Sequence, residues 1–362
     1  MGMENVKLEE RKRSMKEDVD QLSDALQKAT MEEYDKESYV PVASRDKLYI
    51  AMQALSDLNK NLTLLVHGPR GVGKTTLTQH SLNCVKGVVH IQPNPLTVKN
   101  FYESIFEYVD FKTQSESHAA LVIHALKKIK ADEKGIKPTF VVDVNEKCSE
   151  KELMAILIEL KKLVADLNLA NGAVILSISR AALLLPVTLH ELRVRPVNIS
   201  DPPRRTIVNF LEKHLVKLFP DSKPEEREGW IASYSPEIGT RFLDAANLIS
   251  ELGMAKSEES LTTTVSDFVQ EFVSQRKKTY RSSALKFVTM VDKRKRKEVL
   301  TGIINNDLPL DKLVEATGIK DEESLIKTLA NLHPHPVYID VSTSLVGAGN
   351  FVASSEFKKI IK

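Results

Sequence analysis

A glycine-rich turn between a strand-like run and a helix-like run constrains this chain more than any other feature. The apolar run Leu62–Val66 is followed by the turn and then by Thr76–His80, and the turn reads Gly68-Pro69-Arg70-Gly71-Val72-Gly73-Lys74-Thr75. This spacing fits G-x-x-x-x-G-K-[ST], in which the glycines let the backbone turn tightly and aim successive N–H groups at a phosphate. The alternative is a glycine-rich strand-to-helix turn with a solvated lysine.

The same turn defines a candidate phosphate and metal site. Lys74 would neutralise phosphate oxygens, and the Thr75 hydroxyl would complete the shell of a Mg²⁺ ion that keeps most of its waters. The positive end of the following helix would add to the attraction for phosphate. We therefore assign nucleotide binding to the whole turn: Gly68, Pro69, Arg70, Gly71, Val72, Gly73, Lys74, Thr75 and Thr76.

Length and composition predict an ordered protein of two or three domains. The 362 residues are 42% hydrophobic and 28% charged, and a formal net charge of +2 is too small to identify a partner. Two cysteines, Cys84 and Cys148, cannot build a disulfide framework or a zinc site, which suits a reducing compartment. The most apolar window, Ala173–Leu189, is short for a bilayer span and is interrupted by Arg180 and Pro186. We expect a cytoplasmic protein without a membrane partner.

Four further apolar runs predict the remaining strands of a parallel sheet between helices. They are Gly87–Gln92, Pro138–Asp143, Ala173–Arg180 and Leu192–Ile199. Asp143 ends its run, where a carboxylate can reach the Mg²⁺ shell, so Asp143 and Thr75 are the predicted metal ligands. Ligands of an open parallel sheet lie at the carboxyl ends of its strands, which places Ser177 and Arg180 near the terminal phosphate.

A charged helix is predicted over Lys7–Lys36. One apolar stripe runs along it, formed by Met15, Val19, Leu22, Leu26 and Ala29. The stripe indicates either an arm that binds a protein partner or a second copy, or a helix that packs back on its own domain.

These motifs resemble those of the AAA+ and STAND ATPases. Tyr39–Leu48 resembles the box that lines the adenine pocket in those families, although Ser44 replaces its usual glycine. By this resemblance Val42 and Arg45 contact the nucleotide. The run Ala173–Arg180 resembles the strand whose arginine senses the third phosphate, so Arg180 takes that role; the alternative is a surface arginine that closes a strand.

Two more residues receive roles from the resemblance. Gly239-Thr240-Arg241 resembles the second sensor, in which an arginine near the start of a lid helix points at the phosphates, unless Arg241 lies on the lid surface. AAA+ ATPases usually place a glutamate directly after the acidic strand end, whereas this chain has Val144. Glu146 is therefore the candidate base for the attacking water, and a solvated loop carboxylate is the alternative.

The C-terminal region predicts a winged helix. Helices over Lys297–Asn305, Leu310–Thr317 and Asp321–Leu332 precede two strand-like runs, Val337–Val341 and Phe351–Ala353. The third helix begins with acids, which disfavours its entry into a DNA groove. Upstream lies the basic run Lys293, Arg294, Lys295, Arg296 and Lys297, which indicates a nucleic-acid contact, an acidic partner, a nuclear-import signal or a solvated helix face.

The predicted fold class is α/β: a P-loop NTPase core with a three-layer parallel sheet, followed by an all-α lid and a winged-helix domain. We place the N-terminal helix at 1–38, the core at 39–200, the lid at 201–282 and the winged helix at 283–362. The predicted function is an ATP- and Mg²⁺-dependent conformational switch that hydrolyses ATP, with Lys74, Glu146 and Arg180 as catalytic residues. The alternatives are a nucleotide-stabilised module that binds nucleic acid or protein with little hydrolysis, and a nucleoside kinase.

Overall fold

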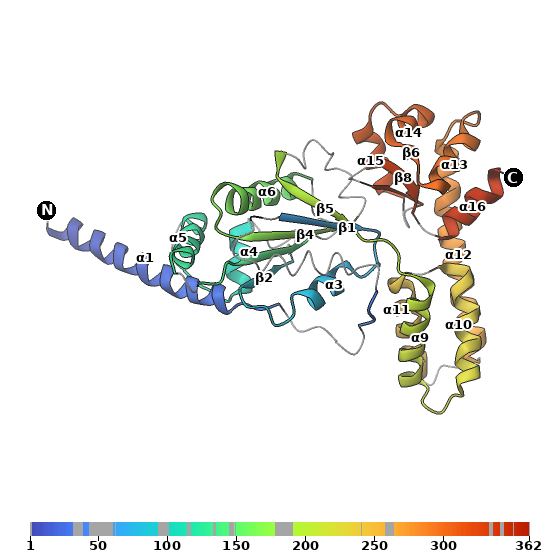
Figure 1. The fold of residues 1–362 in the computed structure, drawn as a ribbon, viewed down its shortest axis with the longest axis horizontal. Coiled ribbons are helices and arrows are strands. Elements are labelled where there is room, and N and C mark those ends of the chain that lie inside the picture. The colour runs from blue at the N-terminus through green and yellow to red at the C-terminus, as the bar shows by residue number, and fades with distance from the viewer. Residues whose placement is uncertain are drawn as a thin grey trace.

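The computed structural model consists of an α/β unit, a helical unit and a smaller C-terminal unit (Figure 1). It describes residues 2–31, 39–42, 61, 63–92, 101–113, 117–132, 135–144, 148, 150–177, 191–239, 241–257, 264–332, 336–340, 344–349 and 351–361. Within these residues, no helix combines the length and the apolar character needed to cross a membrane.

The α/β unit contains a five-stranded sheet in which every pairing is parallel. The strands follow the order β2-β3-β4-β1-β5, so β1 lies between β4 and the edge strand β5. Their bounds are Thr63–Gly68 (β1), Val88–Ile91 (β2), Thr139–Asp143 (β3), Asn171–Ser177 (β4) and Val194–Asn198 (β5). All five strands fall within or overlap the predicted apolar runs, so the predicted parallel sheet is confirmed.

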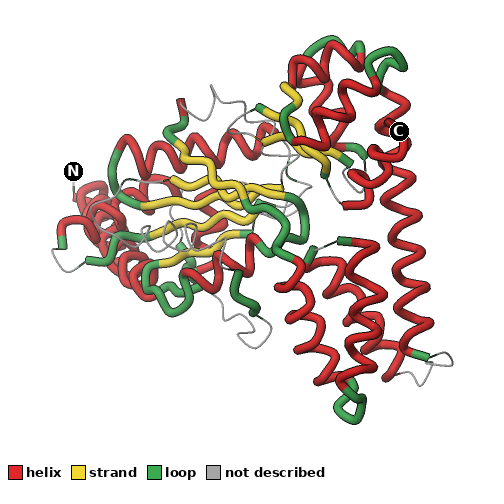
Figure 2. Tube along the Cα trace, turned by 45° about the vertical axis from the view of Figure 1, so that its right-hand side comes forward, coloured by secondary structure: helices red, strands yellow, loops and turns green. Residues whose placement is uncertain are grey.

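Helices cover both faces of this sheet (Figure 2). Alternate residues of β1 point to opposite faces, and Leu65 belongs to one apolar cluster whereas Leu64 and Val66 belong to another. The first cluster is covered by α1 (Gly2–Lys28), α4 (Phe101–Tyr108), α5 (His118–Ala131) and α6 (Glu150–Lys161), and the second by α3 (Lys74–Ser81). A π-helical segment, Lys162–Asp166, continues α6 toward β4. Both faces of the sheet are thus buried, as continuous apolar strands require.

The C-terminal half of α1 packs back on its own domain. Leu22 and Leu26 are fully buried in the cluster with α5, and the Ser23 hydroxyl donates to the Ala125 carbonyl at 3.2 Å. Lys128 forms an ion pair with Asp20 at 2.6 Å. Figure 1 shows the N-terminal part of the helix projecting beyond the core. For the C-terminal half of α1, the prediction of a helix that packs back on its own domain is therefore confirmed.

The helical unit consists of α9 (Arg204–Leu218), α10 (Pro224–Ile238), α11 (Phe242–Ser257) and the long α12 (Val265–Met290). Because proline favours the first turn of a helix, the sequence predicts that Pro236 opens a helix that reaches Leu252, and the structure shows that this prediction is wrong. Residue 236 instead lies in the last turns of α10, and α11 begins at Phe242. The positive φ of Gly239 (102°), which glycine tolerates without steric cost, ends α10 there.

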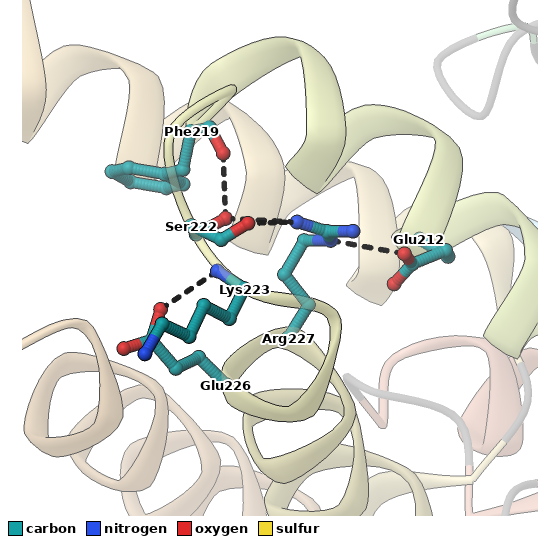
Figure 3. A network of polar contacts seen from close by, with 6 residues as sticks. All are labelled: Glu212, Phe219, Ser222, Lys223, Glu226 and Arg227. Carbon is teal, nitrogen blue, oxygen red and sulfur yellow. Dashed lines mark hydrogen bonds and ion pairs between the residues drawn. The ribbon is translucent and has the colours of Figure 1, made fainter.

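A polar network fixes the turn between α9 and α10 (Figure 3). Arg227 is 8% exposed; its Nε donates to Glu212 at 2.9 Å, and its Nη1 donates to the carbonyl and the hydroxyl of Ser222. The Ser222 hydroxyl donates to the Phe219 carbonyl at 2.5 Å. Because Arg227 is nearly buried, these bonds are shielded from water and hold the corner in one conformation.

We expect Arg227→Ala to destabilise the protein by about 2 to 3 kcal/mol. The substitution removes charge-assisted hydrogen bonds and leaves the Glu212 carboxylate without its cation. Urea unfolding followed by circular dichroism measures this loss. Arg204→Ala, at an exposed arginine of α9, is the matched control and is expected to change stability by less than about 0.5 kcal/mol. Equal midpoints for the two variants would contradict the assigned role.

The C-terminal unit surrounds a small antiparallel sheet of order β6-β8-β7. Its elements are α13 (Arg296–Asn305), β6 (Leu308–Pro309), α14 (Leu310–Thr317), α15 (Glu322–Ala330), β7 (Val337–Asp340), β8 (Leu345–Ala348) and α16 (Phe351–Ile361). The three predicted helices and the first hairpin strand are confirmed. The second hairpin strand was misplaced: Phe351–Ala353 opens α16, and β8 pairs with β7 instead.

Helix α12 connects the last two units as one continuous rod. Its residues up to Tyr280 belong to the apolar cluster of the helical unit, whereas Ala284, Phe287 and Val288 belong to that of the C-terminal unit. Val352 of α16 also packs in the cluster of the helical unit. The two units therefore share α12 and are joined by buried apolar contacts.

Candidate nucleotide-binding site

The glycine-rich turn joins the end of β1 to the start of α3, as its sequence context predicts. Gly71 and Gly73 have φ values of 83° and 86°, a region that favours glycine. At Gly68 the limit is space, because a Cβ there would lie 2.2 Å from the Ile199 carbonyl oxygen. The three glycines thus allow a turn that a chain with side chains at these positions could not form.

Lys74 and Val72 anchor this turn from opposite sides. The Lys74 ammonium donates to the carbonyls of Gly68 and Pro69, each at 3.0 Å, so it crosses back over its own loop. Val72 is fully buried in the apolar cluster beneath the sheet. Arg70 and Thr76 are exposed. The loop therefore holds the Lys74 ammonium against two of its own backbone carbonyls.

The two predicted metal ligands lie in direct contact. Thr75 Oγ1 donates to Asp143 Oδ2 at 2.5 Å, although the residues are 68 positions apart. Asp143 is half-buried at the carboxyl end of β3, and Thr75 is in the first turn of α3. A hydroxyl and a carboxylate, completed by phosphate oxygens and water, fit the oxygen ligands that Mg²⁺ uses in phosphate-transfer sites. Within the described residues, no cluster of three or more acidic, histidine or cysteine side chains offers a metal site.

A cavity of about 480 Å³ opens beside the turn, between the α/β unit and the helical unit. Its volume is within the range of small-molecule sites. The lining residues come from the segment before the core, from the turn with α3, and from α9 and α11: Tyr39, Val40, Gly71, Gly73, Thr76, Phe210, His214, Phe242, Leu243, Ala246, Ile249 and Ser250. Most are apolar, so the cavity is suited to a flat apolar group attached to a phosphate chain.

Aromatic rings form one wall of this cavity. The ring of Phe210 lies 4.5 Å from that of His214 and 5.4 Å from that of Phe242, edge to face with the latter. Tyr39, which also lines the cavity, stacks on His80 with ring centroids 3.8 Å apart, and burial lowers the pKa of His80. Stacked and edge-on rings are surfaces that a purine base can contact.

Residues 241–243, at the start of α11, connect three parts of the molecule. Leu243 N–H donates to the Gly71 carbonyl at 3.1 Å, and Phe242 lines the cavity. Arg241 is 9% exposed, its Nε lies 3.3 Å from Asp201 Oδ1, and its Nη2 donates to the Gly349 carbonyl. The glycine-rich turn, the segment between β5 and α9, and the loop between β8 and α16 therefore meet at one short stretch of chain.

A buried carboxylate lies next to this stretch. Asp244 is 3% exposed and accepts a hydrogen bond from the Tyr280 hydroxyl of α12 at 2.7 Å. Burial raises the pKa of Asp244, while the Tyr280 hydrogen bond and the positive charge of Arg241 lower it. Asp244 and Arg241 together connect the first turn of α11 to the helix that leads into the C-terminal unit.

Other predicted site residues are placed only in part. Arg45, Glu146 and Arg180 lie outside the described residues, as does the Ser177 side chain. The backbone of Ser177 pairs in register with Gly68, the first residue of the glycine-rich turn. Val42 is buried, and among the described residues it is Tyr39 and Val40 of that segment that line the cavity. Val144, where the resemblance leads one to expect a glutamate, is also buried.

The cavity residues of α9 and α11 were not predicted from the sequence. A signal for them exists, because Phe210 and His214 are spaced i, i+4, and Phe242, Ala246 and Ile249 are spaced i, i+4, i+7. The same spacing describes any helix face that packs in a core, so it could not mark a ligand site. Only the position of α11 over the glycine-rich turn distinguishes a cavity wall from a helix face that packs in a core.

Fold and site define an α/β protein in which a five-stranded parallel sheet and its glycine-rich turn are followed by a helical region and a small antiparallel sheet. No family model matches the chain, and no curated protein matches it. Among solved structures, it is similar to domain III of the replication initiation protein DnaA from Thermotoga maritima. That match has 14% identity and a TM-score of 0.43, and it covers 68% of this chain and 98% of that chain. At these values the likeness carries no argument about function.

Proposed function

We propose that this chain is an AAA+/STAND-type ATPase that binds Mg·ATP and works as a nucleotide-dependent conformational switch. The observation that carries the proposal is the meeting of three features at one edge of the sheet: the phosphate turn, the Thr75–Asp143 contact and the aromatic cavity. Each suits one part of a nucleotide. The turn suits the phosphates, the hydroxyl–carboxylate pair suits the metal, and the cavity suits the base.

The assigned residues have distinct tasks in this proposal. Backbone N–H groups from Gly71 to Thr75 and the Lys74 ammonium bind the phosphates, and Thr75 and Asp143 hold Mg²⁺. Mg²⁺ held there would neutralise charge on the phosphate oxygens. Glu146 would accept a proton from the attacking water, and Arg180, three residues after the end of β4, would contact the terminal phosphate. Ser177, Val42 and Arg45 complete the proposed nucleotide contacts.

The switch rests on the stretch Arg241–Leu243. A nucleotide in the cavity would lie against Phe242 and next to the Leu243–Gly71 hydrogen bond, while Arg241 is two residues away and holds the Gly349 carbonyl. A phosphate that drew the guanidinium toward itself would weaken the hold on the C-terminal unit, which we propose is a winged helix. Binding would then favour a different arrangement of the units through its different affinity for the two states.

We expect Glu146→Gln to lower the rate of ATP hydrolysis by at least tenfold while leaving ATP affinity unchanged. A general base contributes on the order of 10² to 10⁴ to such rates, and glutamine cannot accept the proton. Phosphate release and calorimetric ATP titration measure the two quantities on the same protein. Glu107→Gln, at an exposed glutamate of α4, is the control.

The same experiment separates the proposal from its alternative. Turnover by Glu146→Gln at the parent rate would remove Glu146 from the mechanism. A parent protein that binds Mg·ATP tightly but does not turn it over would instead support a nucleotide-stabilised binding module. In such a module, the binding of the nucleotide, without its hydrolysis, would change the conformation of the protein. For either function we propose a cytoplasmic location and a protein partner or self-association.

A further inference from the structure

Positive charge is concentrated on the segment that joins the helical unit to the C-terminal unit. Residues 276–297 contain ten lysines and arginines and one acid, Asp292, although the whole chain carries a formal net charge of only +2. The rest of the chain is therefore net negative. The segment comprises the second half of α12, the following turn and the start of α13.

Contacts within the protein divide nine of these ten cations, all except Lys277, into two groups. Some are used internally, in the contacts Arg276–Glu251, Arg281–Glu356, Lys295–Glu315 and Arg296 to the Val291 carbonyl. Five others are exposed, and their side chains form no hydrogen bond or ion pair with any described residue: Lys278, Lys286, Lys293, Arg294 and Lys297. We name these five residues the α12–α13 basic face. Their charge is not compensated by the described part of the molecule.

The basic face extends well beyond the run that the sequence marks. Lys278 and Lys286 are eight residues apart, so they lie two turns apart on the solvent side of α12, roughly 12 Å along the axis. The opposite side of the helix carries its buried residues, among them Phe272, Tyr280 and Phe287. Lys295 and Arg296, two of the five residues of the sequence run, are occupied internally. The five uncompensated charges are therefore distributed along α12, the turn after it and the start of α13.

The chemistry of this face favours a polyanion over a protein or a membrane. Protein interfaces rely on buried aromatic and apolar anchors, and a membrane-bound helix needs an apolar face to insert. Among the residues of α12 that belong to the basic segment, Leu285 is the large exposed apolar side chain, and the rings of Tyr280 and Phe287 are buried. Contacts to nucleic-acid phosphates, in contrast, need only positive charge placed at intervals.

Two details favour a DNA duplex over single strands. Single-strand binding relies on exposed aromatic rings for base stacking, and the two rings of the basic segment, Tyr280 and Phe287, are buried. The wide major groove of B-form DNA leaves backbone phosphates within reach of one helix face, whereas the major groove of A-form RNA is narrow and deep. Helix α15 does not suit base readout, since Asp321, Glu322 and Glu323 stand at its N-terminus.

We infer that the α12–α13 basic face binds the phosphate backbone of a DNA duplex without reading its sequence. With five phosphates neutralised, the logarithm of the binding constant should fall with the logarithm of salt concentration with a slope of about −4.5. This slope corresponds to a loss of affinity of roughly 500-fold between 50 mM and 200 mM salt. The inference does not depend on nucleotide binding.

The test uses the full chain and a fluorescent 30-base-pair DNA of mixed sequence, in a salt series without and with Mg·ATP. The variant replaces all five residues of the face by glutamine. The matched control replaces five exposed lysines elsewhere: Lys16, Lys86, Lys112, Lys127 and Lys151. We expect the face variant to lose at least tenfold in affinity at 50 mM salt and most of the salt slope, while the control binds within about twofold to threefold of the parent.

Three outcomes would overturn the inference. They are a parent that does not bind DNA at 50 mM salt, a control that loses as much as the face variant, and single-stranded DNA or duplex RNA binding more tightly than duplex DNA. Anionic vesicles and a poly-glutamate peptide are run as competitors, and displacement of DNA by either at equal charge concentration would reassign the face. Since all ten substitutions are at exposed positions, circular dichroism is expected to be unchanged. Mg·ATP titration of the face variant reports separately on the phosphate turn.

Discussion

Replacement of Lys74 by alanine should raise the dissociation constant for Mg·ATP by about a hundredfold. The ammonium is next to the turn and donates to two of its own carbonyls, so it is already in place to bind phosphate oxygens. Loss of charge-assisted hydrogen bonds to a phosphate is worth about 3 kcal/mol, which corresponds to the hundredfold change. Isothermal titration calorimetry at constant Mg²⁺ measures it directly.

A control and a second variant make this result specific. Lys86→Ala removes an exposed lysine from the same domain and should leave the affinity within about twofold of the parent. Ala246→Phe places a ring in the cavity, and it should weaken ATP while leaving binding of inorganic triphosphate unchanged, because only the base site is filled. If Lys74→Ala binds Mg·ATP as tightly as the parent does, the glycine-rich turn is not a phosphate site.

The parts of this site that sequence could predict are those whose chemistry is local. The turn needs glycines at fixed positions, and Asp143 needs only to end a buried strand that is parallel to β1. Because parallel strands deliver their carboxyl ends to one edge, the contact between Thr75 and Asp143 follows from the strand pattern. The sheet itself was predictable for the same reason, since its strands are short apolar runs buried on both faces.

The parts that sequence could not predict depend on packing between units. Phe210, His214 and Phe242 look like core residues, and only the placement of α11 over Gly71 turns them into a cavity wall. Lys295 and Arg296 look like free cations until Glu315 and the Val291 carbonyl come near them. Apolar strand-like runs mislead in the same way, because Phe351–Ala353 is equally suited to the buried side of a helix, where Val352 packs against the helical unit.

The contact between Arg241 and the C-terminal unit leads to the second large effect. We expect Arg241→Ala to increase hydrogen exchange of the backbone amides in α16 by roughly thirtyfold, because the contacts to Asp201 and Gly349 are charge-assisted and nearly buried. Their loss should cost about 2 kcal/mol of the free energy that holds the C-terminal unit in place. Exchange followed by mass spectrometry on peptides from 345–361 measures the change. Arg205→Ala, at an exposed arginine of α9, is the control.

The same exchange measurement, made without and with Mg·ATP, tests whether the Arg241 guanidinium couples nucleotide binding to the C-terminal unit. In the parent, saturating Mg·ATP should increase exchange in α16, because phosphate competes with the Gly349 carbonyl for Arg241. In Arg241→Ala the contact is already lost, so ATP should change the exchange little, although it still binds through Lys74 and the turn. If ATP alters exchange equally in both proteins, Arg241 does not carry the coupling. If exchange in α16 of Arg241→Ala without ATP equals that of the parent, its bond to Gly349 does not hold the C-terminal unit. Linkage between binding and conformation is reciprocal, so the Arg241–Gly349 contact, if ATP weakens it, must also oppose ATP binding. Arg241→Ala loses a contact to phosphate, but it also loses this opposing contact. Its affinity for ATP should therefore fall by no more than the loss of the phosphate contact alone would cause.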